Sequence, residues 1–492
     1  QRDLPRDRVA YFAEHRLDFP GLFIEGEPRR SYPYGTLVAH LLGYLGEISE
    51  FQLHRTEDEG YQSGDLLGQY GLERTYESVL RGHYGSGQVE VDAFGREMQV
   101  IAARPPRPGS NLILTLDLHL QQLAERLLEQ HTGSIIALDP RSGQILALAS
   151  SPAFDPNIFA MRLSTADWTA LASSPKYPLH HRALQGQYPP GSIFKIVVAL
   201  AALEEGVITS RTTKFCPGHY VYGRRTYRDW KRGGHGLVNL HQALTQSCDV
   251  YFYGVGRELG VDRIAQYARA FGLGQATGFA PDIEQSGLVP STQWKRQARG
   301  QPWYPGETLS VAIGQGYMLL TPLQAVTMIA TLANGGTLYK PYVVLRQESA
   351  DGTVLHEATP TVLRTLQVNP QHVAAVQQGL WSVVHDPKGT GKKARHDHVA
   401  IAGKTGTAQV VRLRKSAGHR QHQEQIPEDQ RDHAWFVAFA PFEAPRIAVV
   451  VMIEHAGKGG SYFADYATAI IQAHLRRYLV ATGPLDTTSH LP

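Results

Sequence analysis

The spacing of apolar positions predicts one sheet near the end of the chain. Residues 401–411, 434–440 and 447–454 are apolar runs of strand length, rich in β-branched and aromatic side chains. They follow one another without an intervening helix, which favours antiparallel pairing, and residues 466–478 have the pattern of a closing helix. The connection 412–431 is polar and charged, which predicts a mobile loop.

The middle of the chain is dominated by helical patterns. Residues 192–204 are apolar nearly all round, so this helix is expected to be buried. The other predicted elements are strands at 111–116, 134–138 and 145–149 and helices at 118–130 and 237–259, the last of which fits one or two helices. Many helices followed by consecutive strands indicate an α+β fold, with an antiparallel sheet flanked by helices.

A proline-rich segment, Arg104-Pro-Pro-Arg-Pro-Gly109, predicts the domain boundary, because consecutive prolines exclude helix and favour extended backbone. We therefore expect a smaller domain at residues 1–108, a large domain at 109–482 and a tail at 483–492. The smaller domain is rich in glycine, arginine and short strand-like runs such as residues 88–93.

Composition excludes several classes of function. The net charge of +3 over 492 residues, without a long basic block, argues against nucleic acid as a partner. No apolar run approaches the roughly 18 residues of a membrane-spanning helix. The first residue is Gln1, so an anchor or signal that has been removed is one expectation.

Ser192-Ile-Phe-Lys195 is a candidate nucleophile and base. Residues three apart share a helical face, so the lysine amine can reach the serine hydroxyl, and burial favours the neutral amine that a base requires. The helix N-terminus also favours developing negative charge. Alone, the motif is weak, and it favours a capping serine and a lysine that extends to solvent over a catalytic pair.

Two further motifs follow. Ser247-Cys-Asp249 places a hydroxyl and a carboxylate at a helix entry, although a capping sequence would look the same. Lys404-Thr-Gly-Thr407 lies in a strand pattern, where Thr405 and Thr407 share a face and Gly406 permits close approach of a substrate backbone. A phosphate loop is rejected, because His398 stands where it requires glycine and the segment continues as strand.

Together the three motifs indicate serine acyl transfer. S-x-x-K, S-x-D and K-T-G-T occur in this order, as in penicillin-binding proteins and serine β-lactamases. Asp249 stands where asparagine is common, and it can accept but not donate a hydrogen bond. We found no additional motif supplying a carboxylate to activate water, which favours a transpeptidase over a β-lactamase.

The sequence resembles class B penicillin-binding proteins, most closely the elongation-specific type, over nearly its whole length. The N-terminal blocks His40-Leu-Leu-Gly-Tyr-Leu-Gly46 and Gly71-Leu-Glu-Arg-Thr-Tyr-Glu77 are similar to the pedestal of that family. Tyr188-Pro-Pro-Gly-Ser192 and Ile313-Gly-Gln-Gly-Tyr317 are similar to its transpeptidase domain, and Tyr227-Arg-Asp-Trp230 to its elongation-specific branch.

The resemblance implies a role for each motif. Ser192 would be the nucleophile, Lys195 its base, and Ser247 a proton relay between Lys195 and Lys404. Lys404, Thr405 and Thr407 would bind the substrate carboxylate, and the N–H groups of Ser192 and Thr407 would form an oxyanion hole. The implied reaction cross-links peptidoglycan stem peptides, needs no cofactor for catalysis and is blocked by β-lactam antibiotics.

The resemblance also implies a location and a partner. Members of the family are anchored by an N-terminal helix, absent from this chain, at the periplasmic face of the bacterial inner membrane. The elongation-specific type works with a membrane glycosyltransferase of the rod-shape system. A β-lactam sensor and a silent scaffold remain alternatives, which the N-terminal blocks and the intact Ser192, Lys195 and Lys404, respectively, disfavour.

A second candidate site is a structural zinc site. Cys216, Asp229, His235 and Cys248 fall in one short stretch that contains both cysteines of the chain, and these are residue types that zinc prefers. The spacing matches no standard zinc-finger pattern, so a disulfide or two separate buried thiols remain alternatives. A metal here would hold the loop at 227–236 against the second motif.

Overall fold

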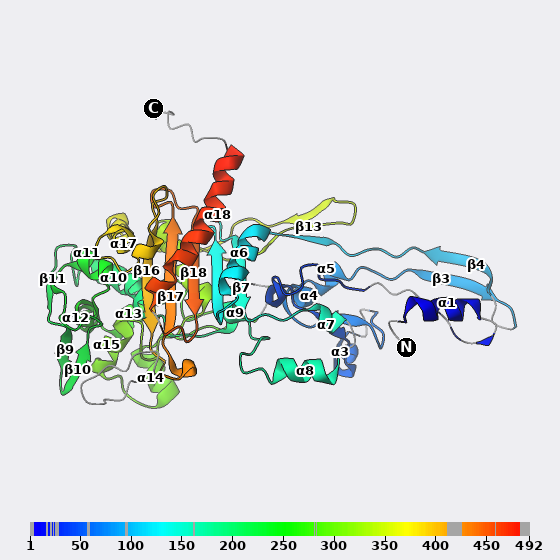
Figure 1. Cartoon of the computed structure of the whole chain (residues 1–492), viewed down its shortest axis with the longest axis horizontal. Coiled ribbons are helices and arrows are strands. Elements are labelled where there is room, and N and C mark those ends of the chain that lie inside the picture. The colour runs from blue at the N-terminus through cyan, green and yellow to red at the C-terminus, as the bar shows by residue number, and fades with distance from the viewer. Residues whose placement is uncertain are drawn as a thin grey trace.

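A computed structural model of the 492-residue chain gives the arrangement of its elements (Figure 1). The structure describes all residues except 1–3, 16–17, 20–21, 23, 25–28, 57–59, 94–96, 161–162, 280, 282, 411–425, 458 and 483–492, and the side chains of 477–482. Most of the loop predicted at 412–431 therefore lies outside the described residues.

The centre of the molecule is a five-stranded sheet. Its strands lie in the order β16 (Ala402–Ala408), β17 (His433–Ala440), β18 (Ile447–Ile453), β6 (Gly133–Leu138) and β7 (Ile145–Ser151). Every neighbouring pair is antiparallel, as predicted for an α+β fold. Strand β16 is an edge strand, and it is shorter than the predicted run 401–411.

The sheet separates two hydrophobic cores, because successive side chains of a strand point to opposite faces. In β17, Trp435, Val437 and Phe439 belong to one core, whereas Phe436 and Ala438 belong to the other. All eight residues of β17 are buried, which explains why its sequence is an apolar run without alternation.

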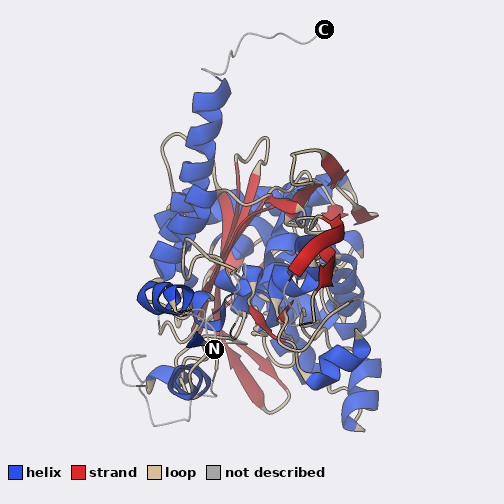
Figure 2. Ribbon diagram, turned by 90° about the vertical axis from the view of Figure 1, so that its right-hand side faces the viewer, coloured by secondary structure: helices blue, strands red, loops and turns tan. Residues whose placement is uncertain are grey.

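Different helices cover the two faces (Figures 1 and 2). Helices α6 (Leu118–Leu128) and α18 (Ala464–Thr482) pack in the smaller core. The larger core contains α9 (Arg182–Gln185), α10 (Lys195–Glu204), α11 (Leu240–Thr245), α12 (Asp249–Leu259), α13 (Val261–Ala270), α15 (Pro305–Ala312), α16 (Pro322–Ala333) and α17 (Pro370–His385).

Two predicted helices differ in detail. The helix expected at 192–204 begins as a 3₁₀ turn, η3 (Gly191–Phe194), and becomes α-helical only at Lys195. Its predicted burial is confirmed from Lys195 to Leu203. The region 237–259 forms the two helices α11 and α12, which are separated where Ser247 adopts a φ of 55°, a left-handed conformation that a helix interior does not accept.

The remaining elements are short and lie around this body. They include β5 (Asn111–Leu114), β8 (Lys214–Cys216), β9 (His219–Tyr222), β10 (Arg225–Arg228), β11 (Gly236–Val238), β12 (Thr337–Tyr339), β13 (Val344–Glu348), β14 (Val354–Glu357), β15 (Val362–Thr365), α7 (Asn157–Ala160), α8 (Thr165–Ala172) and α14 (Thr292–Arg299). The hairpin β9–β10 and the pair β8–β11 project together at one end.

The N-terminal region extends away from the sheet (Figure 1). A long hairpin of β3 (Ser86–Val91) and β4 (Glu97–Arg104) forms its far end. Its other elements are α1 (Arg6–Glu14), α2 (Ala39–Leu42), β1 (Leu45–Glu47), α3 (Glu50–Arg55), β2 (Leu66–Gly68), α4 (Gly71–Thr75) and α5 (Glu77–Leu80). Leu41 and Leu72 belong to the larger core, so the base of this region packs directly on the large domain.

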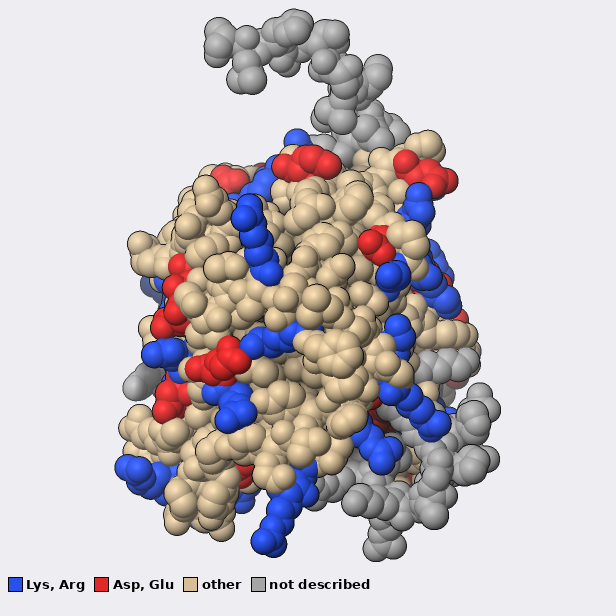
Figure 3. All heavy atoms as spheres, turned by 90° about the vertical axis from the view of Figure 1, so that its left-hand side faces the viewer, with Lys and Arg blue, Asp and Glu red and all other residues tan. Residues whose placement is uncertain are grey.

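Two further observations concern the helices and the surface charge. Among the described residues, no helix combines the length and apolar content needed to cross a bilayer. The face that lies at the left end of Figure 1 presents both cationic and anionic side chains, interspersed among neutral ones, rather than a field of one sign (Figure 3).

A buried ion pair fixes the segment that leads to Ser192. Glu454 directly follows β18, and its Oε1 accepts from Arg182 Nε at 3.0 Å and from the Tyr188 hydroxyl at 2.5 Å. The Arg182 side chain is 3% exposed and also donates to backbone carbonyls of the segment before it. Trp435 Nε1 donates to the carbonyl of Pro189, which ties the same segment to β17.

We predict that Arg182→Ala lowers the free energy of unfolding by about 3–5 kcal/mol, because it leaves the Glu454 carboxylate buried without its cationic partner. The matched control is Arg263→Ala, which removes an exposed arginine from Glu205 at 3.3 Å and should cost less than about 1 kcal/mol. Urea unfolding of both variants measures the difference. Equal losses would contradict a special role for the buried pair.

Candidate active site

Ser192 lies at a close contact between the turn η3 and the edge strand. Gly191 has a φ of 56°, and a Cβ at this position would lie 2.4 Å from the carbonyl oxygen of Thr407. Only glycine therefore permits both the backbone conformation and this approach. Ser192 is half-buried, and the next residues of the chain are completely buried.

Lys195 begins α10 and is fully buried. Its Nζ donates to Asp249 Oδ1 at 2.6 Å, to the carbonyl of Ser247 at 2.8 Å and to the Ser247 hydroxyl at 3.4 Å. The first and second motifs, which lie about fifty residues apart in the sequence, are thus joined by direct contacts. Within the described residues, the hydroxyl of Ser192 makes no hydrogen bond, so it is not committed to a structural partner.

Lys404 brings the third motif to the same point. Its side chain is completely buried, and Nζ donates to the Ser247 hydroxyl at 2.9 Å and to the carbonyl of Thr405 at 3.0 Å. The Ser247 hydroxyl therefore lies between the two lysine amines. The left-handed backbone of Ser247 turns its side chain to this position, at a conformational cost that most folds avoid.

Burial governs the electrostatics of Lys404. Loss of hydration, together with the nearby charge of Lys195, holds the pKa of Lys404 well below its usual range, and Asp249 opposes this shift only in part. The site therefore brings two amines and one carboxylate into a region without water. A hydroxyl between two amines can accept a proton from one and pass a proton to the other.

Strand β16 presents its other motif residues along the free edge. The Thr405 hydroxyl lies 2.8 Å from that of Thr390, while Thr407 is exposed and its carbonyl accepts from Gln315 Nε2 at 3.1 Å. A Cβ at Gly406 would lie 3.0 Å from the Pro190 carbonyl oxygen. Gly406 thus allows β16 to pack against the Ser192 turn, a reason that differs from the expected approach of a substrate.

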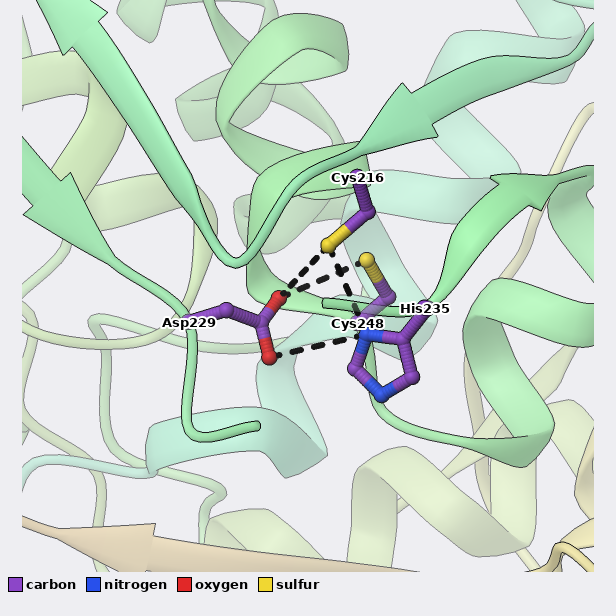
Figure 4. Close-up of side chains that lie close together, drawn as sticks. All are labelled: Cys216, Asp229, His235 and Cys248. Carbon is purple, nitrogen blue, oxygen red and sulfur yellow. Dashed lines mark hydrogen bonds and ion pairs between the residues drawn. The ribbon is translucent and has the colours of Figure 1, made fainter. Parts of the chain in front are cut away.

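The four residues of the second candidate site form one cluster (Figure 4). One ligand atom from each of Cys216, Asp229, His235 and Cys248 can be chosen so that all lie within 4.8 Å of one another. Cys216 Sγ lies 3.5 Å from both Asp229 Oδ2 and His235 Nδ1, and Cys248 Sγ lies 3.4 Å from Asp229 Oδ2. Both cysteines are free thiols, so the structure does not contain the alternative disulfide.

Asp229 connects this cluster to the candidate active site. Its Oδ2 accepts from the backbone N–H groups of Asp249 and Val250, at 2.9 and 3.1 Å, and so caps the first turn of α12. The next residue, Trp230, donates its backbone N–H to Asp249 Oδ2 at 3.2 Å. The loop therefore orients the carboxylate that holds Lys195.

Several contacts were not predicted from the sequence. Thr390, Gln315 and the backbone of Trp230 contact motif residues. Gln315 and Trp230 lie in blocks that resemble the family, but those blocks did not indicate these contacts, and Thr390 lies in no recognised block. Thr390 lies 15 residues before Thr405 and Gln315 lies 92 residues before Thr407, so only the fold brings these pairs together.

Two family profiles match the chain. Residues 133–473 match the penicillin binding protein transpeptidase domain, and residues 1–114 match the penicillin-binding protein dimerisation domain. Among curated proteins, the peptidoglycan D,D-transpeptidase MrdA of Escherichia coli K12 is 38% identical over 464 residues, which are 93% of this chain and 73% of that protein. MrdA of Acinetobacter baumannii is 38% identical over 461 residues, 93% of this chain and 68% of that protein.

Solved structures agree with these relatives. The complex of penicillin-binding protein 2 (PBP2) with MreC from Helicobacter pylori has a chain that superposes with a TM-score of 0.84 and 30% identity, covering 98% of this chain and 84% of that one. PBP2 of Pseudomonas aeruginosa, in complex with WCK 5153, has a TM-score of 0.77 and 36% identity, covering 94% and 93% of the two chains.

We predict that Lys404→Met leaves the fold as stable as before or stabilises it by up to about 2 kcal/mol, because the apolar side chain fills a similar volume without desolvating an amine. The low pKa of the native Lys404 means that the unfolded state binds more protons up to about pH 10.5. As pH rises from 7 toward 10, the free energy of unfolding of the wild type should therefore increase relative to that of the variant. Urea unfolding at three pH values measures both effects. A large loss of stability in the variant at pH 7, or a stability difference that does not change with pH, would contradict the prediction.

Proposed function

Because the chain belongs to the penicillin-binding protein family of transpeptidases, we propose that Ser192 forms the acyl-enzyme through which it cross-links peptidoglycan. The chain is a serine-type peptidoglycan D,D-transpeptidase of the PBP2 (MrdA) kind, acting in cell elongation, and it is acylated by β-lactams. What we add is the assignment of its residues to the steps of the reaction.

One observation supports this assignment more than any other. The hydroxyl of Ser247 lies between the buried amines of Lys195 and Lys404, at 3.4 and 2.9 Å. A left-handed serine backbone and two buried lysines each lower the stability of a core. A purely structural role therefore does not explain why the fold holds them together. Serine acyl transfer requires a base for the hydroxyl and a proton donor for the leaving amine, and two amines joined by a hydroxyl can supply both.

In the first half-reaction, Ser192 Oγ attacks the carbonyl carbon of the penultimate D-alanine of a donor stem peptide. Lys195 takes the hydroxyl proton, and the path through Ser247 returns a proton to the leaving amine of the terminal D-alanine. The N–H groups of Ser192 and Thr407 stabilise the oxyanion, and the close packing of Gly191 on Thr407 brings these two backbones together.

Substrate recognition uses the free edge of β16. Thr405 and Thr407 offer hydroxyls for the terminal carboxylate, and the amine of Lys404 lies beside them, since its Nζ donates to the carbonyl of Thr405 at 3.0 Å. The positive charge expected of Lys404 conflicts with its lowered pKa, so we assign this amine hydrogen bonding and proton transfer rather than charge. In the described part of the chain no strand pairs with the outer edge of β16, so an extended peptide can add to the sheet there through backbone hydrogen bonds, replacing the bond from Gln315 to the carbonyl of Thr407 where it needs that group. Asp249 acts on Lys195, which it holds at 2.6 Å, rather than on the substrate.

We expect labelled penicillin to form a covalent adduct on Ser192, and Ser192→Ala to abolish labelling without loss of fold. Mass spectrometry of the digested adduct locates the label, and thermal unfolding checks the variant. Slow release of the label fits a transpeptidase, whereas rapid release would indicate a β-lactamase. Normal labelling of Ser192→Ala would refute the assignment.

The relatives also suggest partners and a location. One similar structure is a PBP2 in complex with MreC, and another is described as coordinating polymerization and crosslinking in a peptidoglycan synthase complex. We therefore propose that this chain works beside a membrane glycosyltransferase at the periplasmic face of the inner membrane, held there by an N-terminal helix. Residues 1–108 would serve as the pedestal and residues 109–482 as the catalytic domain, followed by the tail 483–492.

We also propose that the four-residue cluster binds a structural zinc ion. In a tetrahedral site, ligand atoms 2.0–2.3 Å from zinc lie roughly 3.3–3.8 Å from one another. The contacts of 3.4–3.5 Å that join Cys216 to Asp229 Oδ2 and His235, and Cys248 to Asp229 Oδ2, fit this geometry, while the remaining separations, of up to 4.8 Å, would shorten on binding. His235 Nε2 is buried without a partner, while its Nδ1 faces the cluster. All four positions would be filled by side chains, so this zinc would hold the loop and would not activate water.

Chelation, or the variant Cys216→Ser, should lower the melting temperature, because a closed zinc site stabilises only the folded state. Acylation of Ser192 should also slow, because Asp229 and Trp230 would no longer hold Asp249 in place. Elemental analysis of protein purified without chelator should find about one zinc per chain. Absence of zinc in protein that retains full stability would contradict the proposal.

A further inference from the structure

A hollow of about 570 Å³ opens beside the candidate active site. Its lining consists of Thr390, Lys392, Lys393, Gly459, Ser461 and Tyr462. These residues come from two segments, the loop after α17 with its turn η4 (Lys392–Ala394) and the turn η7 (Gly460–Tyr462) that precedes α18. A volume of this size holds several amino-acid residues rather than one.

The hollow adjoins the hydroxyls that we assign to carboxylate binding. Thr390, in its wall, lies 2.8 Å from the Thr405 hydroxyl. A Cβ added to Gly459, also in its wall, would lie 3.0 Å from Thr407 Oγ1. The hollow therefore borders both hydroxyls, with Thr390 between it and Thr405 and the side-chain-free Gly459 between it and Thr407.

The hollow is cationic. Lys392 Nζ donates to the carbonyl of Pro387 at 3.0 Å, and Lys393 Nζ donates to the carbonyl of Tyr462 at 3.4 Å and lies 4.2 Å from the centre of its ring. Both ammonium groups are thus held by neutral partners, and no carboxylate in the described part of the chain pairs with either. They can receive an anion from outside the chain.

The chemistry of cross-linking indicates what binds there. The leaving group of the first half-reaction is an amine with a neighbouring carboxylate. The acceptor amine attacks the same ester carbonyl, so it must enter where the leaving amine departed. The acceptor is a whole stem peptide, and it needs more room beyond Thr405 and Thr407 than one D-alanine does.

We propose that this hollow is the acceptor site. Lys392 and Lys393 select an acceptor stem peptide that carries a second carboxylate, farther along the peptide than the carboxylate next to its nucleophilic amine. The inference rests on the proposed function of Ser192. In the step concerned, the acceptor nitrogen bonds to the acyl carbon and the bond from that carbon to Ser192 Oγ breaks. One proton of the amine passes to Ser192 Oγ, through Lys195, which regenerates the serine.

Two matched acceptors test the charge preference. Both are D-lysine with a free α-amine and α-carboxylate, acylated on the ε-amine with N-acetylglutamate in one case and N-acetylglutamine in the other. The two probes differ by one distal negative charge. With a peptide thioester as acyl donor, mass spectrometry measures the ratio of transfer to hydrolysis for each probe, and calorimetry measures the binding of each probe to the Ser192→Ala protein, in which no tethered leaving group occupies the site.

We expect the wild type to prefer the glutamate probe, and Lys392→Glu and Lys393→Glu each to reduce this preference roughly three- to tenfold. Labelling of Ser192 by penicillin should remain close to the wild-type rate in both variants, because among the described residues neither lysine forms a hydrogen bond or an ion pair with a residue of the three motifs. The matched control is Lys388→Glu, an exposed lysine of the same loop that does not line the hollow, which should keep the preference.

The two hypotheses fail separately. If penicillin does not label Ser192, the proposed function itself is wrong. If Ser192 is labelled but the wild type shows no preference in transfer or binding, or if the preference persists in both lysine variants, the acceptor site is wrong and the proposed function stands. If Lys388→Glu lowers the preference as much as Lys393→Glu does, the effect comes from general surface charge. That result would also overturn the assignment of the acceptor site.

Discussion

The arrangement of this protein depends on the hydroxyl of Ser247, which lies between two buried lysine amines. Lys195 comes from a helix in the larger core, Lys404 from the edge of the sheet, and Ser247 from the break between α11 and α12. Two amines this close are unfavourable in a region without water, so the surrounding structure must hold them there. Asp249 offsets part of this cost, and the packing of the sheet offsets the remainder.

The shell around these three residues explains features that otherwise look unrelated. Gly191 and Gly406 lack side chains where the Ser192 turn meets β16, so the two segments can touch. The ion pair between Arg182 and Glu454 fixes the segment that leads into that turn. On the other side, Asp229 both belongs to the four-residue cluster and caps α12, so a loop outside the site determines where Asp249 lies.

The sequence allowed prediction of the α+β class, the strands of the sheet and the three catalytic motifs, because each is encoded locally in apolar spacing or in residues a few positions apart. The four-residue cluster was also predicted, since both cysteines occur in one short stretch. The 3₁₀ start of the helix at Ser192 and the contacts of Thr390 and Gln315 were not. They follow from long-range packing. Gln315 lies in a block that resembles the family, but the block does not indicate its contact with Thr407, and no local pattern distinguishes Thr390 from other loop residues. The proposed acceptor site depends wholly on such contacts.

The free edge of β16 has a further consequence for drug resistance. An edge strand binds a peptide through main-chain groups, which are common to all peptides and are imitated by the amide of a β-lactam. Substitutions along β16 cannot readily exclude the antibiotic and keep the substrate, since both present the same groups to the same edge. Selection for resistance should therefore favour changes in the loops that surround the strand, where the two ligands differ in shape and charge.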